Sequence, residues 1–314
     1  MGARTGSEPS LGWIGTGRMG YEMAWRLLNR PSPVTVYNRT RAKAEPLREF
    51  GATIASGLPE LAGCEVVFVA VSSSEDLRQV LLGTSGLLSG TGRPKVVVDF
   101  STVGADASAE IRKQLLGLGV ELLAAPVSGN PKVARAGRLT MAVSGPRSAF
   151  DFVAELLSVL GSSATYVGEG ELARLVKLCH NLFLGVVTQS LVEVTVLAEK
   201  GGVSREAFLR YLNASVLGST FTKYKTPQLV NADYRATFTT KLLNKDFDLG
   251  LAAARELEVP LPLAAQVREM VVTLVNLGFG EEDFAALLEL QGRNSGLPVV
   301  GEQAEVPDGL DQAE

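Results

Sequence analysis

The chain has 314 residues, of which 46% are hydrophobic and 20% are charged, and its formal net charge at pH 7 is -4. This length exceeds what one hydrophobic core usually organises, so we expect two domains with ample apolar material for both. Phosphate binding requires clustered positive charge. A net negative charge without a dense Lys/Arg block therefore argues against a nucleic-acid-binding protein and against attachment to an acidic membrane surface.

The two cysteines, Cys64 and Cys179, stand in apolar contexts without a metal-ligand spacing, which favours two buried thiols in a reducing compartment and no metal site. The first ten residues lack the apolar run of a secretory signal, and Gly6 stands where a myristoylation signal needs Ser or Thr. Polar residues interrupt the most apolar stretch, 182–198, so we expect no membrane span. These features predict a cytoplasmic protein.

Short β-type runs alternate with helical patterns from residue 11 to residue 168. The β-type runs are nearly continuous in apolar residues, as strands covered on both faces of a parallel sheet are. We expect strands at 11–15, 34–38, 65–71, 95–101, 120–128, 139–145 and 164–168, and helices at 18–30, 41–50 and 104–119. The alternation predicts an α/β domain over 11–169 with a doubly wound, Rossmann-type parallel sheet.

Long helical stretches take over beyond residue 170, where no comparable β-type run occurs. The first stretch, 171–200, would be about 45 Å long at ~1.5 Å per residue. Because it is apolar on most sides, neighbouring helices or a second subunit should cover it. We therefore expect an all-α C-terminal domain over 170–300, joined to the first domain by this long helix, and flexible tails at 1–10 and 301–314.

A glycine-rich sequence, GTGRMG at 15–20, lies directly between the first strand and the first helix. Gly15 permits a tight turn, Gly17 lets the backbone approach a pyrophosphate, and Gly20 allows close packing of helix on strand, while the helix N-terminus attracts the anion. This placement favours a dinucleotide site over a simple glycine turn. The predicted cofactor contacts here are Gly15, Thr16, Gly17, Arg18 and Met19.

The second strand ends in Asn38, Arg39 and Thr40, at a point where NAD-selective proteins usually place Asp or Glu on the ribose hydroxyls. A guanidinium and two neutral hydrogen-bonding groups suit a 2′-phosphate, which a carboxylate would repel. The sequence therefore predicts that NADP(H) is favoured over NAD(H). The alternative is that Arg39 is only a solvated loop residue.

One lysine and the chain's single histidine lie in the apolar part of the long helix. At about 100° per residue, Lys177, His180 and Asn181 share about one-third of the helix circumference. Partial burial disfavours the charged form of a lysine, which would let Lys177 donate or accept a proton, and Asn181 could orient the same oxygen. By itself the stretch favours a lysine that extends to water or pairs with Glu171 or Glu193. For His180 it favours a core residue, or one that supports the residues of the site, over a catalyst.

Five motifs in order resemble the β-hydroxyacid dehydrogenase family, the group of 3-hydroxyisobutyrate dehydrogenase, the glyoxylate/succinic semialdehyde reductases and, more distantly, 6-phosphogluconate dehydrogenase. The resemblance covers residues 11 to about 298. The motifs are GWIGTGRMG followed by EMA, DFST at 99–102, APVSGN at 125–130, KLCHN at 177–181 and KDFDLGLA at 245–252. Together they imply a hydride-transferring enzyme on a Rossmann-type fold.

The resemblance also implies roles for matching residues. Lys177 would donate a proton to the substrate carbonyl during reduction and accept one from the hydroxyl during oxidation, with Asn181 helping to hold that group. Ser128, Gly129 and Asn130 would line the site of the substrate carboxylate. On the nicotinamide side of the cofactor the resemblance places Val71, Ser72, Thr102 and Lys245, the last of these reaching over from the helical domain.

Two departures from the family pattern concern the substrate side. Ala124 stands where the family usually has an acidic residue before APVSG, and Asn130 replaces a second glycine. In the GxxGxGxxxK loop before the lysine, Glu171 and Ala173 replace two of the glycines, so we expect the long helix to begin earlier here. Neither change removes the residues implied in hydride transfer.

These features predict an NADP(H)-dependent oxidoreductase that transfers a hydride between the nicotinamide and a small β-hydroxyacid or an aldehyde or keto acid, with Lys177 as general acid/base. Two alternatives stay open. An imine reductase shares the architecture and the NRT loop but commonly carries Asp or Tyr in place of the lysine. A non-catalytic NADP-binding interaction protein would lack the lysine and carry an appended basic or reader segment. The apolar long helix and the family both favour a homodimer or homotetramer.

Overall fold

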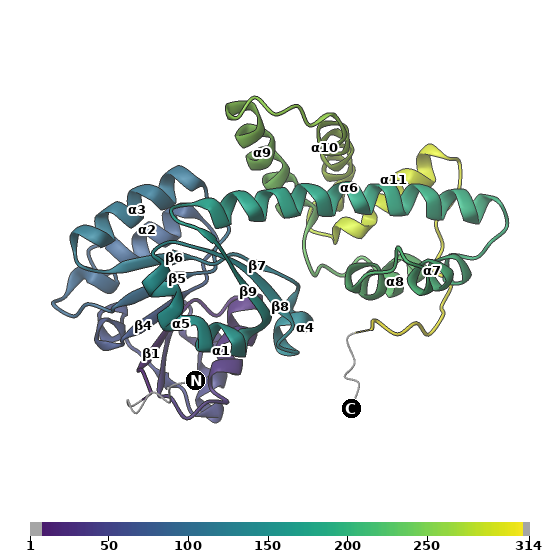
Figure 1. Ribbon diagram of the computed structural model, residues 1–314. Helices are drawn as coiled ribbons and strands as arrows, with labels where there is room; N and C mark the ends of the chain where they lie inside the picture. Colours follow the sequence, from purple (N-terminus) through teal and green to yellow (C-terminus); the bar gives the residue numbers. More distant parts are fainter. Residues whose placement is uncertain (1–7, 310–314) are drawn as a thin grey trace. The chain divides into compact units, whose positions relative to one another are not determined.

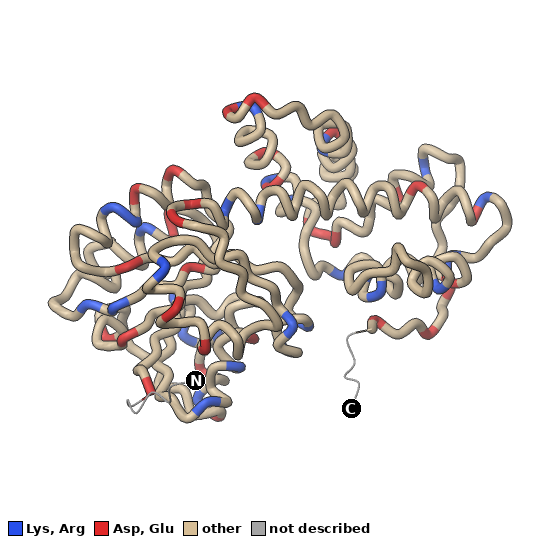
Figure 2. Tube along the Cα trace, in the orientation of Figure 1, with Lys and Arg blue, Asp and Glu red and all other residues tan. Residues whose placement is uncertain are grey.

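The computed structural model describes residues 8–309 and divides into two compact units, Met1–Lys177 and Leu178–Glu314 (Figure 1). The outer parts of the two predicted tails, 1–7 and 310–314, lie outside the described residues. The first unit is a mostly parallel sheet with helices and the second is helical, so the predicted fold class is confirmed. Basic and acidic residues are interspersed along both units (Figure 2).

The first unit is built on one sheet of nine strands in the order β3-β2-β1-β4-β5-β6-β8-β7, with β9 paired to β8. The strands are β1 (Leu11–Ile14), β2 (Val34–Tyr37), β3 (Thr53–Ile54), β4 (Val66–Val69), β5 (Val96–Asp99), β6 (Glu121–Ala124), β7 (Val127–Ser128), β8 (Leu139–Ser144) and β9 (Gly161–Gly168). The first six are parallel and have the dinucleotide-binding order, whose ligand crevice lies beyond the carboxyl ends of β1 and β4.

The far edge of the sheet departs from the expected all-parallel arrangement. The strand β8 is antiparallel to β6 and β7. Only α4 (Pro131–Arg135) connects β7 to β8, and it is too short for the crossover that a parallel neighbour requires. The expected strand 120–128 is also divided, into β6 and β7, because Pro126 between them has no N–H to donate to a ladder.

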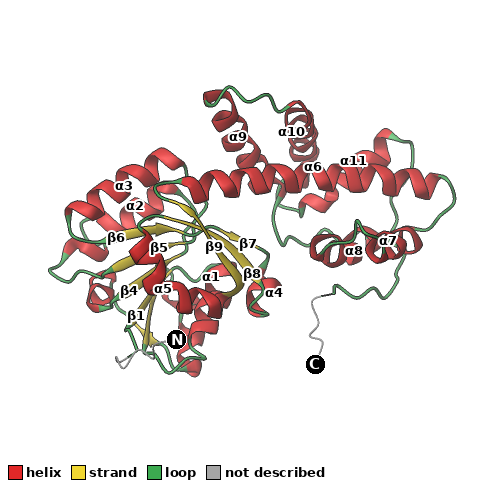
Figure 3. Cartoon of the chain, in the orientation of Figure 1, coloured by secondary structure: helices red, strands yellow, loops and turns green. Residues whose placement is uncertain are grey.

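Helices cover both faces of the sheet, with α2 and α3 on one face and α1 and α5 on the other (Figure 3). They are α1 (Arg18–Leu27), α2 (Ser74–Leu82), α3 (Ala105–Gly117) and α5 (Arg147–Leu160). The helix expected at 41–50 is wrong: these residues form two short 3-10 segments, Arg41–Lys43 and Glu45–Phe50. Pro46 explains the break, because it lacks the N–H that would bond to the carbonyl four residues earlier in an α-helix, and its ring disfavours the α conformation of the preceding residue.

Buried aromatic rings hold the strands whose ends form the crevice. Trp13 of β1 and Phe68 of β4 stack with a ring-centroid distance of 5.7 Å, and Phe100, directly after β5, stacks on both at 5.8 Å. All three side chains are at most 5% exposed. Their packing sets the relative positions of the loops that follow these strands.

The second unit has its own core, which helices from the rest of the chain provide. They are α6 (Leu172–Lys200), which begins in the first unit, α7 (Arg205–Ala214), α8 (Thr220–Asn231), α9 (Thr240–Glu256), α10 (Pro262–Leu274) and α11 (Leu287–Asn294). By length and composition α6 could cross a membrane, a test that the core helix of a soluble protein also passes, and 50% of its most apolar window is buried. Leu191, Val192 and Val196 of α6 belong to this core.

Residues 302 and 304 are hydrogen-bonded to helices of the second unit, contrary to the flexible tail that we expected at 301–314. The Glu302 carboxylate accepts a hydrogen bond of 2.6 Å from the backbone N of Arg205, the first residue of α7. Asn231 and the backbone of Ala304 exchange two more, of 2.9 and 3.0 Å. Composition shows only that the segment is polar. The structure shows its partners, which are a backbone N–H in the first turn of α7 and the Asn231 side chain at the end of α8.

Candidate active site

The first part of the candidate site is the turn between β1 and α1. Gly15 has a φ of +96°, and a Cβ there would lie 2.1 Å from the Ala70 backbone oxygen. A Cβ on Gly20 would lie 2.1 Å from the Gly15 oxygen, so both positions require glycine. A Cβ on Gly17, the N-cap of α1, would meet nothing within 4 Å. This open space at a helix N-terminus fits a pyrophosphate group.

The side chain of Asn38 joins this turn to the loop after β2. Its Oδ1 accepts a hydrogen bond of 2.9 Å from the Thr16 backbone N, and its Nδ2 donates one of 2.9 Å to the Thr40 oxygen. The oxygen and the nitrogen of the amide are thus both bonded within the protein, and the contact of Asn38 with the cofactor stays a prediction. An aspartate would lose the second bond, because a carboxylate cannot donate to a carbonyl.

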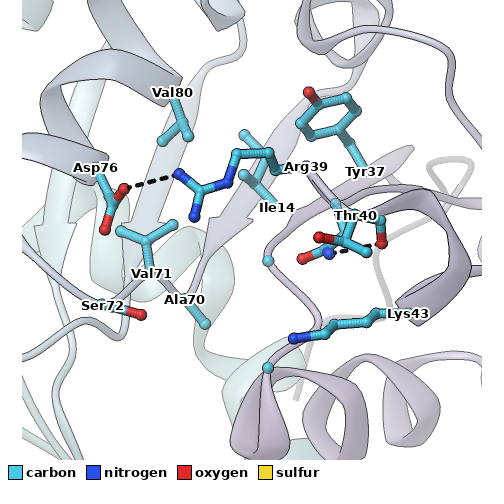
Figure 4. Close-up of a pocket in the computed structure, with 13 residues that line it drawn as sticks. Ile14, Tyr37, Arg39, Thr40, Lys43, Ala70, Val71, Ser72, Asp76 and Val80 are labelled. Atoms are coloured by element: carbon cyan, nitrogen blue, oxygen red, sulfur yellow. Dashed lines mark hydrogen bonds and ion pairs between the residues drawn. The ribbon is translucent and has the colours of Figure 1, made fainter.

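A cleft of about 190 Å³ opens beside the turn (Figure 4). Arg39 extends along it toward Asp76, and Lys43 lies on the side of Thr40. The residues that line it include seven of the predicted cofactor contacts, namely Gly15, Gly17, Asn38, Arg39, Thr40, Val71 and Ser72. The structure therefore brings together groups from three separate loops at one edge of the sheet.

Two cations stand at this cleft. The Arg39 side chain is 89% exposed, and its Nη1 lies 3.5 Å from Asp76 Oδ1, a distance and exposure typical of a weak pair. Lys43 also lines the cleft and, with Arg18, a neighbouring hollow. We did not predict Lys43 from the sequence. Its signal was the spacing, since it stands four residues after Arg39 in a run that also contains Arg41.

The loops after β4 and β5 are tied together at the same edge. Ser101 Oγ accepts a hydrogen bond of 2.9 Å from the Val71 backbone N, and Asp99 Oδ1 accepts one of 2.9 Å from the Ser101 N. Val71 and Ser72 line the cleft, and Thr102 follows in a half-buried position. In the DFST motif, Asp99 and Ser101 therefore shape the loops that the resemblance places beside the nicotinamide.

A buried arginine fastens the first turn of α6 to these loops. Arg174 is 3% exposed and donates three hydrogen bonds: 2.6 Å to Asp99 Oδ2, 3.0 Å to the Ser101 oxygen and 2.9 Å to Glu171 Oε2. Lys177 lies one turn further along α6, in a half-buried position. The predicted acid/base therefore stands on a helical turn that is anchored to the cofactor side of the sheet.

Glu171 extends this network to α3. Its Oε1 accepts a hydrogen bond of 2.7 Å from Arg112, which also donates one of 2.9 Å to the Gly170 oxygen. Burial raises the pKa of the Glu171 carboxyl, but the hydrogen bond from Arg112 and the charges of Arg112 and Arg174 lower it by more, so the net shift of the pKa is downward. The glutamate that replaces a family glycine here directly precedes α6, which begins at Leu172.

The predicted substrate residues form one turn between β7 and α4. Gly129 has a φ of +132°, and a Cβ there would approach Leu139 to 2.7 Å and Val133 to 2.8 Å, so glycine is required. Asn130, which replaces a family glycine, is buried and caps α4, because its Oδ1 accepts a hydrogen bond of 3.0 Å from the Val133 N. Ser128 is half-buried in β7.

In the second unit, the amide of Asn181 is held at both ends. Asp246 of α9, which is 2% exposed, accepts a hydrogen bond of 2.5 Å from Asn181 Nδ2. Asn181 Oδ1 lies 2.9 Å from His180 Nδ1, which must donate because the amide oxygen can only accept. Lys245 Nζ lies 3.9 Å from the other Asp246 oxygen. We did not predict Asp246, although a carboxylate inside the KDFDLGLA motif was its signal.

One expectation for the same stretch of α6 is wrong. Cys179 is exposed, whereas Cys64 is buried as expected. His180 is also exposed, so of the two roles expected for it the core role does not apply, and its contact with Asn181 fits the supporting role. Val176 and Phe183, one turn to either side of Cys179, are 42% and 69% exposed. An apolar neighbourhood along the sequence therefore marked an exposed apolar face of the helix and not the core.

Two family models together cover almost all of the structured chain. The NAD binding domain of 6-phosphogluconate dehydrogenase matches residues 10–168, and the NAD-binding domain of NADP-dependent 3-hydroxyisobutyrate dehydrogenase matches residues 171–291. The chain belongs to the β-hydroxyacid dehydrogenase family. The family membership predicted from the motifs is thereby confirmed, and pyridine-nucleotide binding is supported.

Members of this family resemble the chain over most of its length. Glyoxylate/succinic semialdehyde reductases 2 and 1 of Arabidopsis thaliana are each 31% identical to it, over 89% of this chain and over 78% and 97% of their own lengths. The crystal structure of a 3-hydroxyisobutyrate dehydrogenase from Salmonella typhimurium matches with a TM-score of 0.80 and 26% identity, over 90% of this chain and 100% of that one.

Proposed function

We propose that this family member is an NADP(H)-dependent oxidoreductase for a small β-hydroxyacid or an aldehyde or keto acid, with Lys177 as general acid/base. The observation that carries the proposal is the cleft beside the open glycine turn, which has two cations on its rim, Arg39 and Lys43. The names of the reductases and the dehydrogenase that the chain resembles support the substrate class.

The residues present fit a bound dinucleotide. Backbone N–H groups at the start of α1 would bind the pyrophosphate, and Arg39 and Lys43 would bind the 2′-phosphate. Val71, Ser72 and Thr102 would pack on the nicotinamide side. The cofactor, when bound, would supply or accept the hydride. The cofactor contact of Lys245 stays a prediction.

The substrate would be held and protonated by groups of the chain itself. The Ser128 hydroxyl and backbone N–H groups of the turn at Gly129 would bind its carboxylate. During reduction, Lys177 would donate a proton to the carbonyl oxygen, and during oxidation it would take that proton back from the hydroxyl. Asn181 Nδ2 carries a second hydrogen beyond the one that Asp246 accepts, and this hydrogen would orient the same oxygen.

The test is a substrate panel with both cofactors, in which NADPH or NADH oxidation is followed with glyoxylate, succinic semialdehyde and cyclic imines, and NADP+ or NAD+ reduction with 3-hydroxyisobutyrate and serine. We expect turnover of an aldehyde or hydroxy acid with NADPH preferred. Lys177→Ala should lower kcat by about 100-fold or more, the usual contribution of general acid/base catalysis. The NADPH Kd should change less than about threefold, and Lys113→Ala, at an exposed lysine of α3, should leave kcat unchanged.

Three results would overturn the proposal. Retained turnover in Lys177→Ala would remove the lysine from the mechanism. Activity confined to the imines would favour the imine reductase alternative. Binding of NADPH without turnover of any substrate in the panel would favour the non-catalytic alternative.

We also propose that the protein is a cytoplasmic homodimer or homotetramer. Phe183, Val194 and Leu197 are 69%, 42% and 72% exposed, and helical spacing places them on one face of α6. An exposed apolar face of this kind favours a covering subunit. Sedimentation should give the mass of a dimer or tetramer, and Phe183→Glu with Leu197→Glu should lower it to that of a monomer. A monomeric wild-type protein would refute the proposal.

A further inference from the structure

We infer that Arg174 is a positioning residue for the reaction, which fixes the turn of α6 that carries Lys177 against the loops on the cofactor side; this inference rests on the proposed function. Arg174 uses all three nitrogens of its guanidinium on three different residues. Two of these are Asp99, the last residue of β5, and Ser101, two residues further on, and the third, Glu171, directly precedes α6.

The contact with Ser101 connects Arg174 to the loops that line the cleft. Ser101 accepts from Arg174 through its backbone oxygen, at 3.0 Å, and from the Val71 N through its hydroxyl, at 2.9 Å. Val71 and Ser72 line the cleft. Arg174 therefore touches the loop after β5 directly and reaches the loop after β4 through one side chain.

The position of Lys177 follows from that of Arg174 because a helix is stiff over one turn. Residues three apart on a helix are neighbours, separated by about 60° around the axis. The planar guanidinium bonds in fixed directions, so holding it on three acceptors fixes both the rotation of the first turn of α6 and its position along the axis. A lysine at 174 has one nitrogen and could not reach all three acceptors in that geometry.

The buried charges of this network indicate that it fixes the position of the first turn of α6 and does not only stabilise the fold. Arg112 and Arg174 balance Glu171 and Asp99, and the Arg174 and Asp99 side chains are 2% and 0% exposed. Buried ion pairs are often no more stabilising than apolar residues of the same volume, but they tolerate only one geometry. A network of this kind, one turn before the acid/base lysine, suits a helix whose register controls proton transfer.

The experiment compares Arg174→Lys with the same substitution at a buried arginine remote from the network. Arg205 of the second unit is 0% exposed and bonds to the Glu199 carboxylate and to the Val230 oxygen, so it matches Arg174 in burial and kind of partner. We expect both variants to lower the melting temperature. Only Arg174→Lys should lower kcat, by about tenfold or more, with the NADPH Kd within about threefold, since a shift of 1 Å in reacting groups can cost this much.

A second readout needs no turnover. Hydrogen exchange of the cofactor-free protein should rise in segments 70–73 and 99–103 in Arg174→Lys and in the more disruptive Arg174→Gln, but not in Arg205→Lys. Unchanged hydrogen exchange in both segments would overturn the inference. So would a loss of kcat that occurs in both Arg174→Lys and Arg205→Lys in proportion to their loss of melting temperature. If the wild type turns over no substrate of the panel, the proposed function fails, and the exchange data still decide whether Arg174 holds these loops.

Discussion

The glycine turn allows a sharp prediction, because its glycines differ in what surrounds them. Alanine at Gly15 would pay about 1–2 kcal/mol for the left-handed conformation and about 1–3 kcal/mol more for the Cβ placed 2.1 Å from the Ala70 oxygen. For a domain of this size that loss should lower the melting temperature by at least about 5 °C. The Cβ of a threonine at Gly17 would meet nothing within 4 Å, and threonine is as good an N-cap as glycine, so the melting temperature should stay the same.

For the binding of NADPH, the substitution at Gly17 should have the larger effect. Threonine at Gly17 fills the space in which a pyrophosphate would approach the backbone, and one lost hydrogen bond to a charged group costs about 1.5–3 kcal/mol. The NADPH Kd should therefore rise at least about tenfold. Fluorescence titration of NADPH and thermal melts of the same preparations measure both quantities. NADPH binding within about threefold of the wild type in Gly17→Thr, or an unchanged melting temperature in Gly15→Ala, would refute the reasoning.

Three further predictions concern charges. The pKa of Glu171, lowered from 4.5 by Arg112 and Arg174 against the effect of burial, implies that its stabilisation is complete above about pH 4.5 and is lost as pH falls through the folded-state pKa. Glu171→Gln should thus lower the melting temperature at pH 7 and flatten its decline between about pH 5 and 3; parallel curves would contradict this. Asp76→Asn removes a carboxylate paired with Arg39, so NADPH should bind more tightly while NADH changes less, and equal changes in titration would exclude the idea. Arg39→Ala should weaken binding of NADPH more than that of NADH and reduce its salt dependence, which titrations at about 0.05 and 0.3 M salt would measure.

Much of the first unit could be predicted because its signals are local. Continuous apolar runs identify strands buried on both faces, and the structure has strands within every expected range. Local signals can also conflict: residues 41–50 have helical periodicity, but Pro46 among them prevents one continuous α-helix. The reversed direction of β8 could not be read from its residues, because the composition of a strand is the same in either direction and the short connection decides.

The sequence by itself determined the family and the glycine turn and marked Lys177 as the predicted acid/base, because these depend on residue types at fixed spacings along the chain. Only the tertiary structure decided which distant side chains bind to the residues around Lys177. Arg174 meets Asp99 across 75 positions and Asn181 meets Asp246 across 65, and neither pairing has a periodicity that sequence could display. The physical reason is that a buried charge takes whichever partner the packing of distant elements brings within about 3 Å, whereas a turn or a helix is set by its own neighbours.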